Sequence, residues 1–272
     1  MSITYKNKST DNADKILSDR SPFAVQEAYR LVRTNLMYSS AKDENPIYAV
    51  TSVLPNEGKS LNCSNLAISY AQAGVKTLVI DCDMRNPTQV VTFDCKVKSG
   101  LSEFLAGVRK DVVVQKTTYD NLFVLVSGKI APNPAELLSS SRMRELLVSL
   151  REEYECIFLD LPPTCAVSDA MILSSIVTGY ILVVNANHCD SRALRRTMAA
   201  FDQVGATIIG TVFNGVEQKS RRHRLFGKTG DTYGYGYGYG YGYGYGNDAS
   251  SANKSIALPK KKRSSRSPFE KD

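Results

Sequence analysis

The stretch IYAVTSVLPNEGKS, residues 47–60, decides the fold of this 272-residue chain. Its first half, 47–53, is nearly continuous in apolar and β-branched residues, which is typical of a strand covered on both faces. Its second half ends in Gly58-Lys59-Ser60, and a helical pattern follows over 60–73. A strand, a glycine-containing loop and a helix in this order are the context that a P-loop needs. The stretch therefore predicts a phosphate-binding loop at the end of a buried strand.

The predicted loop offers backbone N–H groups and two polar side chains to a nucleotide. Helix starts bind phosphate because the helix dipole is positive there. Lys59, expected to face solvent, should reach the β- and γ-phosphates of ATP, and the Ser60 hydroxyl should bind Mg²⁺. Val53 stands where the usual motif has its first glycine, and Asn56 can adopt the left-handed backbone that a tight loop often needs. The residues expected to contact ATP are Pro55, Asn56, Glu57, Gly58, Lys59, Ser60 and Leu61.

Two further apolar stretches end in carboxylates. Residues 157–160 read IFLD, a Walker B pattern whose Asp160 is expected to hold Mg²⁺. Residues 78–83 read LVIDCD, so Asp81 and Asp83 share one face of an extended chain. A right-handed crossover puts the end of this strand on the rim that carries the phosphate loop. A turn or a helix cap would explain any one of these acids, but the three segments together predict binding of ATP with Mg²⁺.

The middle of the chain alternates between strand and helix patterns. This alternation predicts an α/β fold of the P-loop NTPase type, a mostly parallel sheet with helices on both faces. The expected strands are 47–53, 77–81, 122–127, 156–160, 180–185 and 207–214. The expected helices are 27–41, 60–73, 134–151, 168–177 and 191–204. Asn214 ends the last strand, where either an adenine contact or a turn with Gly215 accounts for it.

The two ends of the chain differ from the middle in composition. Residues 1–20 read as a flexible lead-in, 21–227 as the ATP-binding domain and 228–272 as a disordered tail. Residues 233–246 are seven Tyr-Gly repeats, which oppose a helix and have little to pack against. The tail 228–272 has eight Lys/Arg and four Asp/Glu, so its charge of +4 makes up much of the net +7. A run of basic residues there can bind acidic lipid headgroups, and no nucleic-acid partner is expected.

The same composition excludes several classes of protein. No apolar run reaches the 18 residues of a membrane helix, and the polar start has no signal-peptide core. We therefore expect a cytoplasmic chain. The six cysteines form no CxxC pair, so they are interpreted as buried free thiols rather than as a metal or redox site.

These motifs together resemble the bacterial tyrosine kinases of capsule and exopolysaccharide synthesis. The resemblance covers about 22–246 and is most specific in a DxDxR segment and a terminal tyrosine cluster. The matching segments are the loop 57–60, Asp81-Cys82-Asp83-Met84-Arg85, Asp160-Leu161-Pro162, the helical set Glu27, Arg30 and Arg33, the stretch PNPAELL at 132–138, and the Tyr-Gly repeat. The departures, Val53 in the loop and Ala131 before Pro132, remove no chemical group.

The resemblance implies a catalytic set made of Lys59, Asp81, Asp83 and Arg85. Asp81 joins Asp160 as a candidate for Mg²⁺, and Asp83 is the candidate to accept the tyrosine proton. The implied phosphorylation sites are Tyr233, Tyr235, Tyr237, Tyr239, Tyr241, Tyr243 and Tyr245.

The resemblance also implies partners. Kinases of the Gram-positive type are separate from their membrane protein, so a transmembrane adaptor of the chain-length-determinant kind would activate this chain and hold it at the membrane. The chains would form a ring through Glu27, Arg30 and Arg33 and phosphorylate one another, and a tyrosine phosphatase would reverse this. A solvated helix face with internal ion pairs is the alternative interpretation of these three residues.

Two other functions fit part of the sequence. ATPases of the MinD/ParA type share the expected fold, but they carry a lysine early in the phosphate loop where this chain has Leu54. A non-catalytic scaffold would use the Tyr-Gly repeat for assembly. Every group expected for phosphoryl transfer is present, which favours the kinase.

Overall fold

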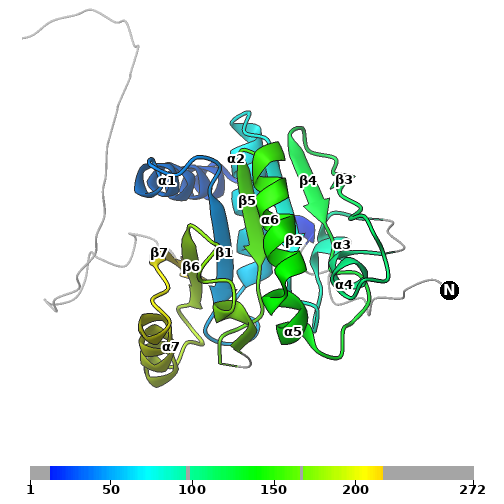
Figure 1. Ribbon diagram of the computed structural model, residues 1–272. Helices are drawn as coiled ribbons and strands as arrows, with labels where there is room; N and C mark the ends of the chain where they lie inside the picture. Colours follow the sequence, from blue (N-terminus) through cyan, green and yellow to red (C-terminus); the bar gives the residue numbers. More distant parts are fainter. Residues whose placement is uncertain (1–12, 96–98, 166–167, 217–272) are drawn as a thin grey trace, which may run out of the picture. The chain divides into compact units, whose positions relative to one another are not determined.

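A seven-stranded sheet forms the centre of the computed structural model, which describes residues 13–95, 99–165 and 168–216 (Figure 1). The order of its strands is β3-β4-β2-β5-β1-β6-β7. All neighbours are parallel except β3, which is antiparallel to β4. The strands are β1 (Ile47–Ser52), β2 (Thr77–Asp81), β3 (Gln115–Lys116), β4 (Leu122–Leu125), β5 (Cys156–Asp160), β6 (Gly179–Asn185) and β7 (Ile208–Asn214).

Helices lie on both faces of this sheet (Figure 1). The α-helices are α1 (Phe23–Ser39), α2 (Lys59–Gln72), α3 (Gln89–Thr92), α4 (Leu101–Leu105), α5 (Pro134–Ser139), α6 (Ser141–Glu153) and α7 (Ser191–Gln203). Two 3-10 turns, η1 (Ala13–Lys15) and η2 (Ser168–Met171), complete the described elements. The expected α/β architecture is therefore confirmed.

Each central strand supplies side chains to two cores. In β1, Ile47 and Ala49 pack with α6, while Tyr48 and Val50 pack with α1 and α2. The same alternation places Phe158 of β5 on the α2 side, where its ring lies 5.3 Å from that of Tyr48. The strands read as continuous apolar runs because both faces are covered.

Several expected boundaries are corrected. The helix expected over 134–151 is two helices, because Ser140 stops α5 and caps α6 by accepting the N–H of Met143 at 3.3 Å. The helix expected over 168–177 is only the 3-10 turn η2 followed by turns, which leaves Leu173 buried in the α6-side core. The short β3, α3 and α4 were not predicted, because two to five residues show no periodicity.

Residues 13–20, expected to belong to a flexible lead-in, pack against the domain. Leu17 is buried, and its backbone N–H donates to the Asn65 side chain of α2 at 2.8 Å. The remaining lead-in, 1–12, and the tail 228–272 lie outside the described residues, together with 217–227. Among the described residues, no helix is long and apolar enough to cross a membrane.

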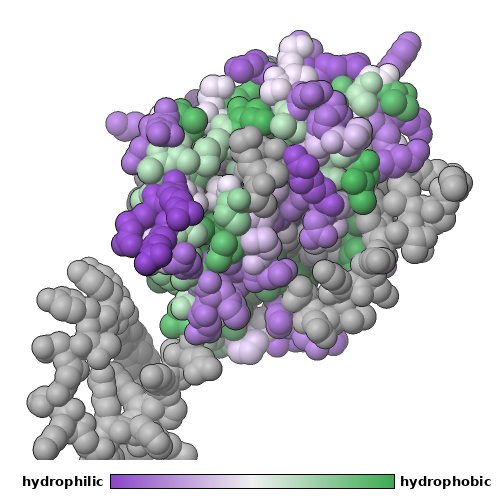
Figure 2. Space-filling model, turned by 90° about the horizontal axis from the view of Figure 1, so that it is seen from below, coloured by the Kyte–Doolittle hydropathy of each residue, from purple (hydrophilic) through white to green (hydrophobic). Residues whose placement is uncertain are grey.

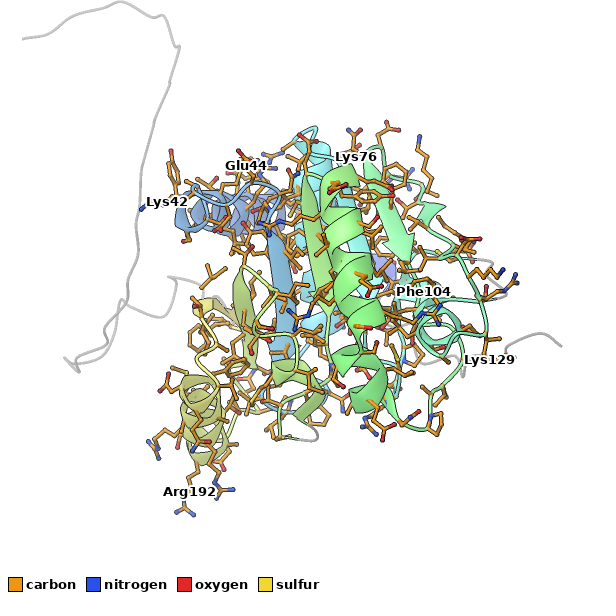
Figure 3. The ribbon with its side chains drawn as sticks, viewed as in Figure 1. Lys42, Glu44, Lys76, Phe104, Lys129 and Arg192 are labelled. Carbon is orange, nitrogen blue, oxygen red and sulfur yellow. The ribbon has the colours of Figure 1, made fainter. Side chains whose placement is uncertain are left out.

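Helix α7 lies at the β7 end of the sheet, beside β6 and β7 (Figure 1). Arg192 lies in the first turn of this helix, and its side chain points away from the sheet (Figure 3). Seen from below, strongly hydrophilic side chains gather at the side of the molecule where α7 lies (Figure 2).

The expectation of buried cysteines holds for three of the six. Cys63, Cys82 and Cys156 are buried, whereas Cys165 is exposed and Cys95 and Cys189 are half-buried. All six thiols are free.

Candidate active site

The loop between β1 and α2 has the backbone of a phosphate loop. Asn56 has φ 64° and Gly58 has φ 91°, both in the left-handed region. The expected left-handed conformation of Asn56 is thus present. Gly58 is also required sterically, since a Cβ there would lie 2.2 Å from the Asn214 side-chain nitrogen.

The Glu57 side chain fixes this loop to the neighbouring strands. It is buried and accepts the N–H of Leu54 at 2.7 Å and the N–H of Asn185, at the end of β6, at 3.2 Å. Asn214, at the end of β7, donates to the Glu57 carbonyl oxygen at 2.9 Å. The side chain of Glu57 is therefore occupied, and only its backbone N–H remains to contact a nucleotide. The turn with Gly215 is present, since the Asn214 side-chain oxygen accepts the N–H of Gly215 at 3.0 Å. The contact of Asn214 with adenine stays a prediction.

Lys59 lies between carboxylates from two other strands. Its ammonium is 2.9 Å from Asp83, 3.1 Å from Asp160 and 3.0 Å from the Ser60 hydroxyl. The expectation that Lys59 faces solvent is wrong, because its side chain is 12% exposed. Burial alone would lower the pKa of Lys59, but the charges of Asp160 and Asp83 raise it above its usual value. Lys59 is therefore charged and already oriented.

Asp81 orders the segment that follows β2. Its carboxylate accepts the N–H groups of Thr88 and Gln89 at 3.0 and 2.9 Å and that of Asp83 at 3.2 Å. Burial, followed by the nearby charge of Asp160, raises the pKa of Asp81 well above its usual range. The crossover expected from the sequence is present, since Asp81, Asp83, Asp160 and Lys59 meet at one rim of the sheet.

Gln89 belongs to this group but was not predicted. Its side chain is fully buried and donates to Asp160 at 2.7 Å and to the Ser60 carbonyl oxygen at 3.3 Å, while it accepts from Ser64 at 2.7 Å. Gln89 thus joins the Walker B strand to the start of α2. The only signal in the sequence was a polar residue, eight positions after Asp81, in front of the apolar pair Val90-Val91.

The three residues predicted on α1 do not act alike. Arg30 pairs with Glu27, and their side chains are 49% and 46% exposed. Arg33 instead donates to the Ser69 carbonyl oxygen of α2 and is half-buried. Arg33 therefore holds α1 against α2 within one chain, whereas Glu27 and Arg30 remain on the surface.

Arg85 and the tail tyrosines are the remaining predicted site residues. Arg85 follows the acidic segment, and its side chain is exposed. The tail tyrosines 233–245 lie outside the described residues.

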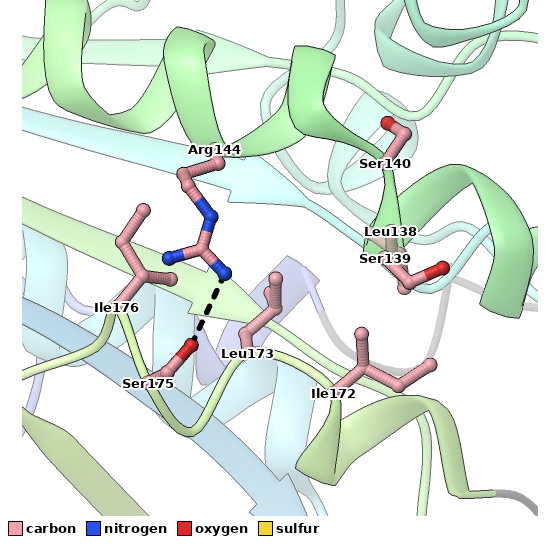
Figure 4. Close-up of a pocket in the computed structure, with 8 residues that line it drawn as sticks. All are labelled: Leu138, Ser139, Ser140, Arg144, Ile172, Leu173, Ser175 and Ile176. Carbon is pink, nitrogen blue, oxygen red and sulfur yellow. Dashed lines mark hydrogen bonds between the residues drawn. The ribbon is translucent and has the colours of Figure 1, made fainter.

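A separate pocket lies between α5, the start of α6 and the turns after η2 (Figure 4). Arg144 crosses it and donates to the Ser175 hydroxyl at 3.4 Å. The pocket is lined by Leu138, Ser139, Ser140, Arg144, Ile172, Leu173, Ser175 and Ile176. None of these residues belongs to the predicted phosphate site.

Comparisons with known proteins agree with this geometry. Residues 56–208 match the family model described as an AAA domain. The chain is 34% identical to the tyrosine-protein kinase YwqD of Bacillus subtilis, over 83% of this chain and 95% of that protein. It is 33% identical to a tyrosine-protein kinase CpsD of Streptococcus agalactiae, over 76% and 90%.

Solved structures give the same result. The kinase domain of Escherichia coli tyrosine kinase ETK matches with a TM-score of 0.69 at 31% identity, over 83% of this chain and 91% of that one. The chimerical protein CapA2B2 matches with a TM-score of 0.66 at 35% identity, over 71% and 85%. The septum site-determining protein MinD of Pyrococcus horikoshii has a TM-score of 0.53 at 22% identity, over 62% and 70%, which shows a shared fold alone.

Proposed function

Since this chain belongs to the bacterial tyrosine kinases of capsule and exopolysaccharide synthesis, we propose that it transfers the γ-phosphoryl group of ATP to tyrosines of its own Tyr-Gly segment. The observation that carries this proposal is the position of Lys59. This lysine starts the helix after the phosphate loop and contacts the carboxylates of Asp83 and Asp160. A cation held in this way can follow the charge that develops during phosphoryl transfer.

Lys59 and Asp83 would exchange partners when ATP binds. The triphosphate carries more negative charge than one carboxylate, so it would draw the Lys59 ammonium away from Asp83. That releases the Asp83 carboxylate, which can then accept the proton of the tyrosine hydroxyl. The phenolic oxygen forms a bond to the γ-phosphorus, the bond from that phosphorus to the bridging oxygen breaks, and ADP leaves.

The donor set at this rim fits Mg²⁺. Asp81 and Asp160 are buried register partners, the Ser60 hydroxyl and Asp160 both contact the Lys59 ammonium, and Mg²⁺ prefers such oxygen ligands. Among the described residues, no group of three or more His, Cys, Asp or Glu could hold a metal. The proposed ion would therefore take its remaining ligands from ATP phosphates and water, with Ser60, Asp160 and Asp81 as protein ligands. When bound, Mg²⁺ would neutralise charge on the phosphates.

We propose that the chains form a ring in which the exposed residues Glu27 and Arg30 contact a neighbouring subunit. A ring would let one chain phosphorylate the tail of its neighbour. The similar protein CapA2B2 is a chimera, and its name combines an A2 part with a B2 part. This supports an adaptor as the activator of the present chain. We propose that such an adaptor is a transmembrane protein, that it recruits this chain to the inner face of the membrane, and that a tyrosine phosphatase resets the tail.

One experiment tests this function. Purified full-length chain is incubated with ATP and Mg²⁺, and phosphorylated residues are mapped by mass spectrometry. We expect most phosphate on the tyrosines at 233–245. Nucleotide hydrolysis without phosphotyrosine would support an ATPase of the MinD/ParA kind, and nucleotide binding without either product would support a scaffold.

A further inference from the structure

Helix α7 carries three arginines on one side of its first two turns. Arg192, Arg195 and Arg196 are spaced i, i+3 and i+4, so their side chains are neighbours on the helix surface. All three are exposed. Arg192, in the first turn of α7, points away from the sheet in Figure 3.

The charge of Arg192 opposes the dipole of its own helix. A helix start is the positive end of the dipole, so basic residues there are unfavourable. The first turn of α7 contains no acidic residue, and its last turn contains no basic one. Asp190 caps the start by accepting the N–H of Arg192 at 3.0 Å. The dipole acts within the first turn, where Arg192 stands, so the stability of α7 does not explain this arginine.

The arginines of α7 also lack carboxylate partners in the part of the chain that the structure describes. The ion pairs found there are those of Arg30 with Glu27 and of Lys59 with Asp83 and Asp160. By contrast, Arg151 of α6 lies in a last turn and donates to the Glu44 carbonyl oxygen at 2.8 Å. The guanidinium groups of α7 are therefore available to an anion from outside the domain.

The chain leaves the described domain next to this surface. Asn214 of β7 is in register with Asn185 of β6, and the Asn187 side chain donates to the Gly215 carbonyl oxygen at 2.9 Å. The described residues end at Val216, beside the loop that leads into α7. Residues 217–232 separate Val216 from the first tail tyrosine, and a flexible segment of that length spans roughly 20–25 Å. The arginines are thus within reach of the Tyr-Gly segment of the same chain.

Charge decides when that segment would bind. Residues 228–272 hold eight basic and four acidic residues, so the unmodified tail is positive by 8 − 4 = 4 and is repelled by the arginines. Each phosphotyrosine adds about −1.5 to −2 charges, and seven would reverse the sign. Guanidinium groups bind phosphate through two parallel hydrogen bonds.

The spacing of the two partners also agrees. Tyrosines two residues apart lie about 7 Å apart along an extended chain. Arg192 and Arg196 lie about 6 Å apart along the helix axis. Consecutive phosphotyrosines can therefore meet Arg192 and Arg196.

We propose that Arg192, Arg195 and Arg196 form a docking surface for the phosphorylated Tyr-Gly segment, residues 233–246, of this chain. The proposal rests on the proposed function, because it needs a kinase that modifies this segment. Docking would hold the modified tail away from the acidic active site and protect its phosphotyrosines from a phosphatase.

A synthetic peptide tests the docking surface without relying on the chain's own activity. The full-length chain is dephosphorylated and kept free of ATP, and its affinity for a fluorescent Tyr-Gly peptide with three phosphotyrosines is measured. The test variant is Arg192→Gln/Arg195→Gln/Arg196→Gln. The matched control, Lys42→Gln/Lys110→Gln/Lys116→Gln, removes the same charge from exposed lysines elsewhere.

We expect the α7 variant to bind the phosphopeptide at least tenfold more weakly than wild type. The control variant should bind it nearly as well as wild type. The unphosphorylated peptide should bind to none of the three proteins. Equal losses in the two variants, or equal binding of both peptides, would overturn the proposal. A third outcome would also overturn it: the wild-type chain binds phosphatidylglycerol vesicles through the arginines but does not bind the phosphopeptide. The surface would then bind a membrane.

Discussion

Asp81 and Asp160 are register partners at the ends of the neighbouring parallel strands β2 and β5, and both side chains are fully buried. Two carboxylates this close in a buried place repel each other unless cations or hydrogen bonds compensate. Lys59 and the amide of Gln89 provide that compensation at Asp160, and backbone N–H groups provide it at Asp81. The site is thus held together by the groups that are proposed to carry out the transfer.

Lys59→Met should abolish phosphotyrosine formation and also lower stability. Removing one partner of a buried ion pair typically costs roughly 3–5 kcal/mol, because the remaining charge is unpaired. Thermal unfolding in Mg²⁺-free buffer, followed beside a phosphotyrosine blot, measures both effects. Lys42→Met, at an exposed position, is the control. Wild-type phosphotyrosine in the Lys59 variant would refute the P-loop assignment.

Asp83→Asn should keep ATP binding and lose transfer. The amide retains the size of the side chain but cannot accept the tyrosine proton. Single-turnover transfer and nucleotide affinity are measured separately, with Asp94→Asn as control. Asp94 has φ 47°, a conformation that asparagine also adopts, so that change should be silent. Near-normal turnover of the Asp83 variant would move the base to another residue, with Asp81 the next candidate.

Gln89→Met should raise the Mg²⁺ concentration needed for nucleotide binding by about tenfold or more. Loss of a side chain that hydrogen-bonds to a metal ligand commonly has an effect of this size. Methionine fills the same volume but cannot donate to Asp160. The Mg²⁺ dependence of binding of a fluorescent ATP analogue is the readout, and Gln72→Met at the exposed end of α2 is the control. An unchanged Mg²⁺ dependence would limit Gln89 to packing.

Glu27→Ala/Arg30→Ala should reduce the size of the assembly measured by light scattering, if α1 forms the subunit contact. Arg33 is left intact because it holds α1 on α2 within one chain. Arg33→Ala alone should lower the melting temperature of the domain. An unchanged size distribution in the double variant would leave the pair as a solvated ion pair, worth only a few tenths of a kcal/mol.

Changing all seven tail tyrosines to Phe should leave ATP binding intact and remove most autophosphorylation.

Unmodified wild-type protein should form the larger assembly, because the modified tail is repelled by the acids of the active site. Intact mass and light scattering before and after incubation with ATP check this. Most phosphate on Tyr29 or Tyr5, or a larger phosphorylated species, would contradict it.

The sequence by itself determined the main strands and brought out the segments of the candidate site. Continuous apolar runs of about five residues such as 156–160 are typical of strands with two covered faces, and the predicted bounds of β2 and β5 are those observed. The glycine, lysine and acids were recognisable because their chemistry requires fixed spacings within one local segment.

Only the tertiary structure decided which distant groups meet. Nothing local indicates that Gln89 donates to Asp160, that Lys59 is buried between two carboxylates, or that Arg33 reaches Ser69. The strand order decides these contacts, because crossovers bring residues far apart in sequence to one rim, and a hydrogen bond depends on that distance. The same holds for α7, whose arginines appear in the sequence as an ordinary basic helix. The pairing of β7 with β6 is what places the last described residues beside the loop that leads into α7.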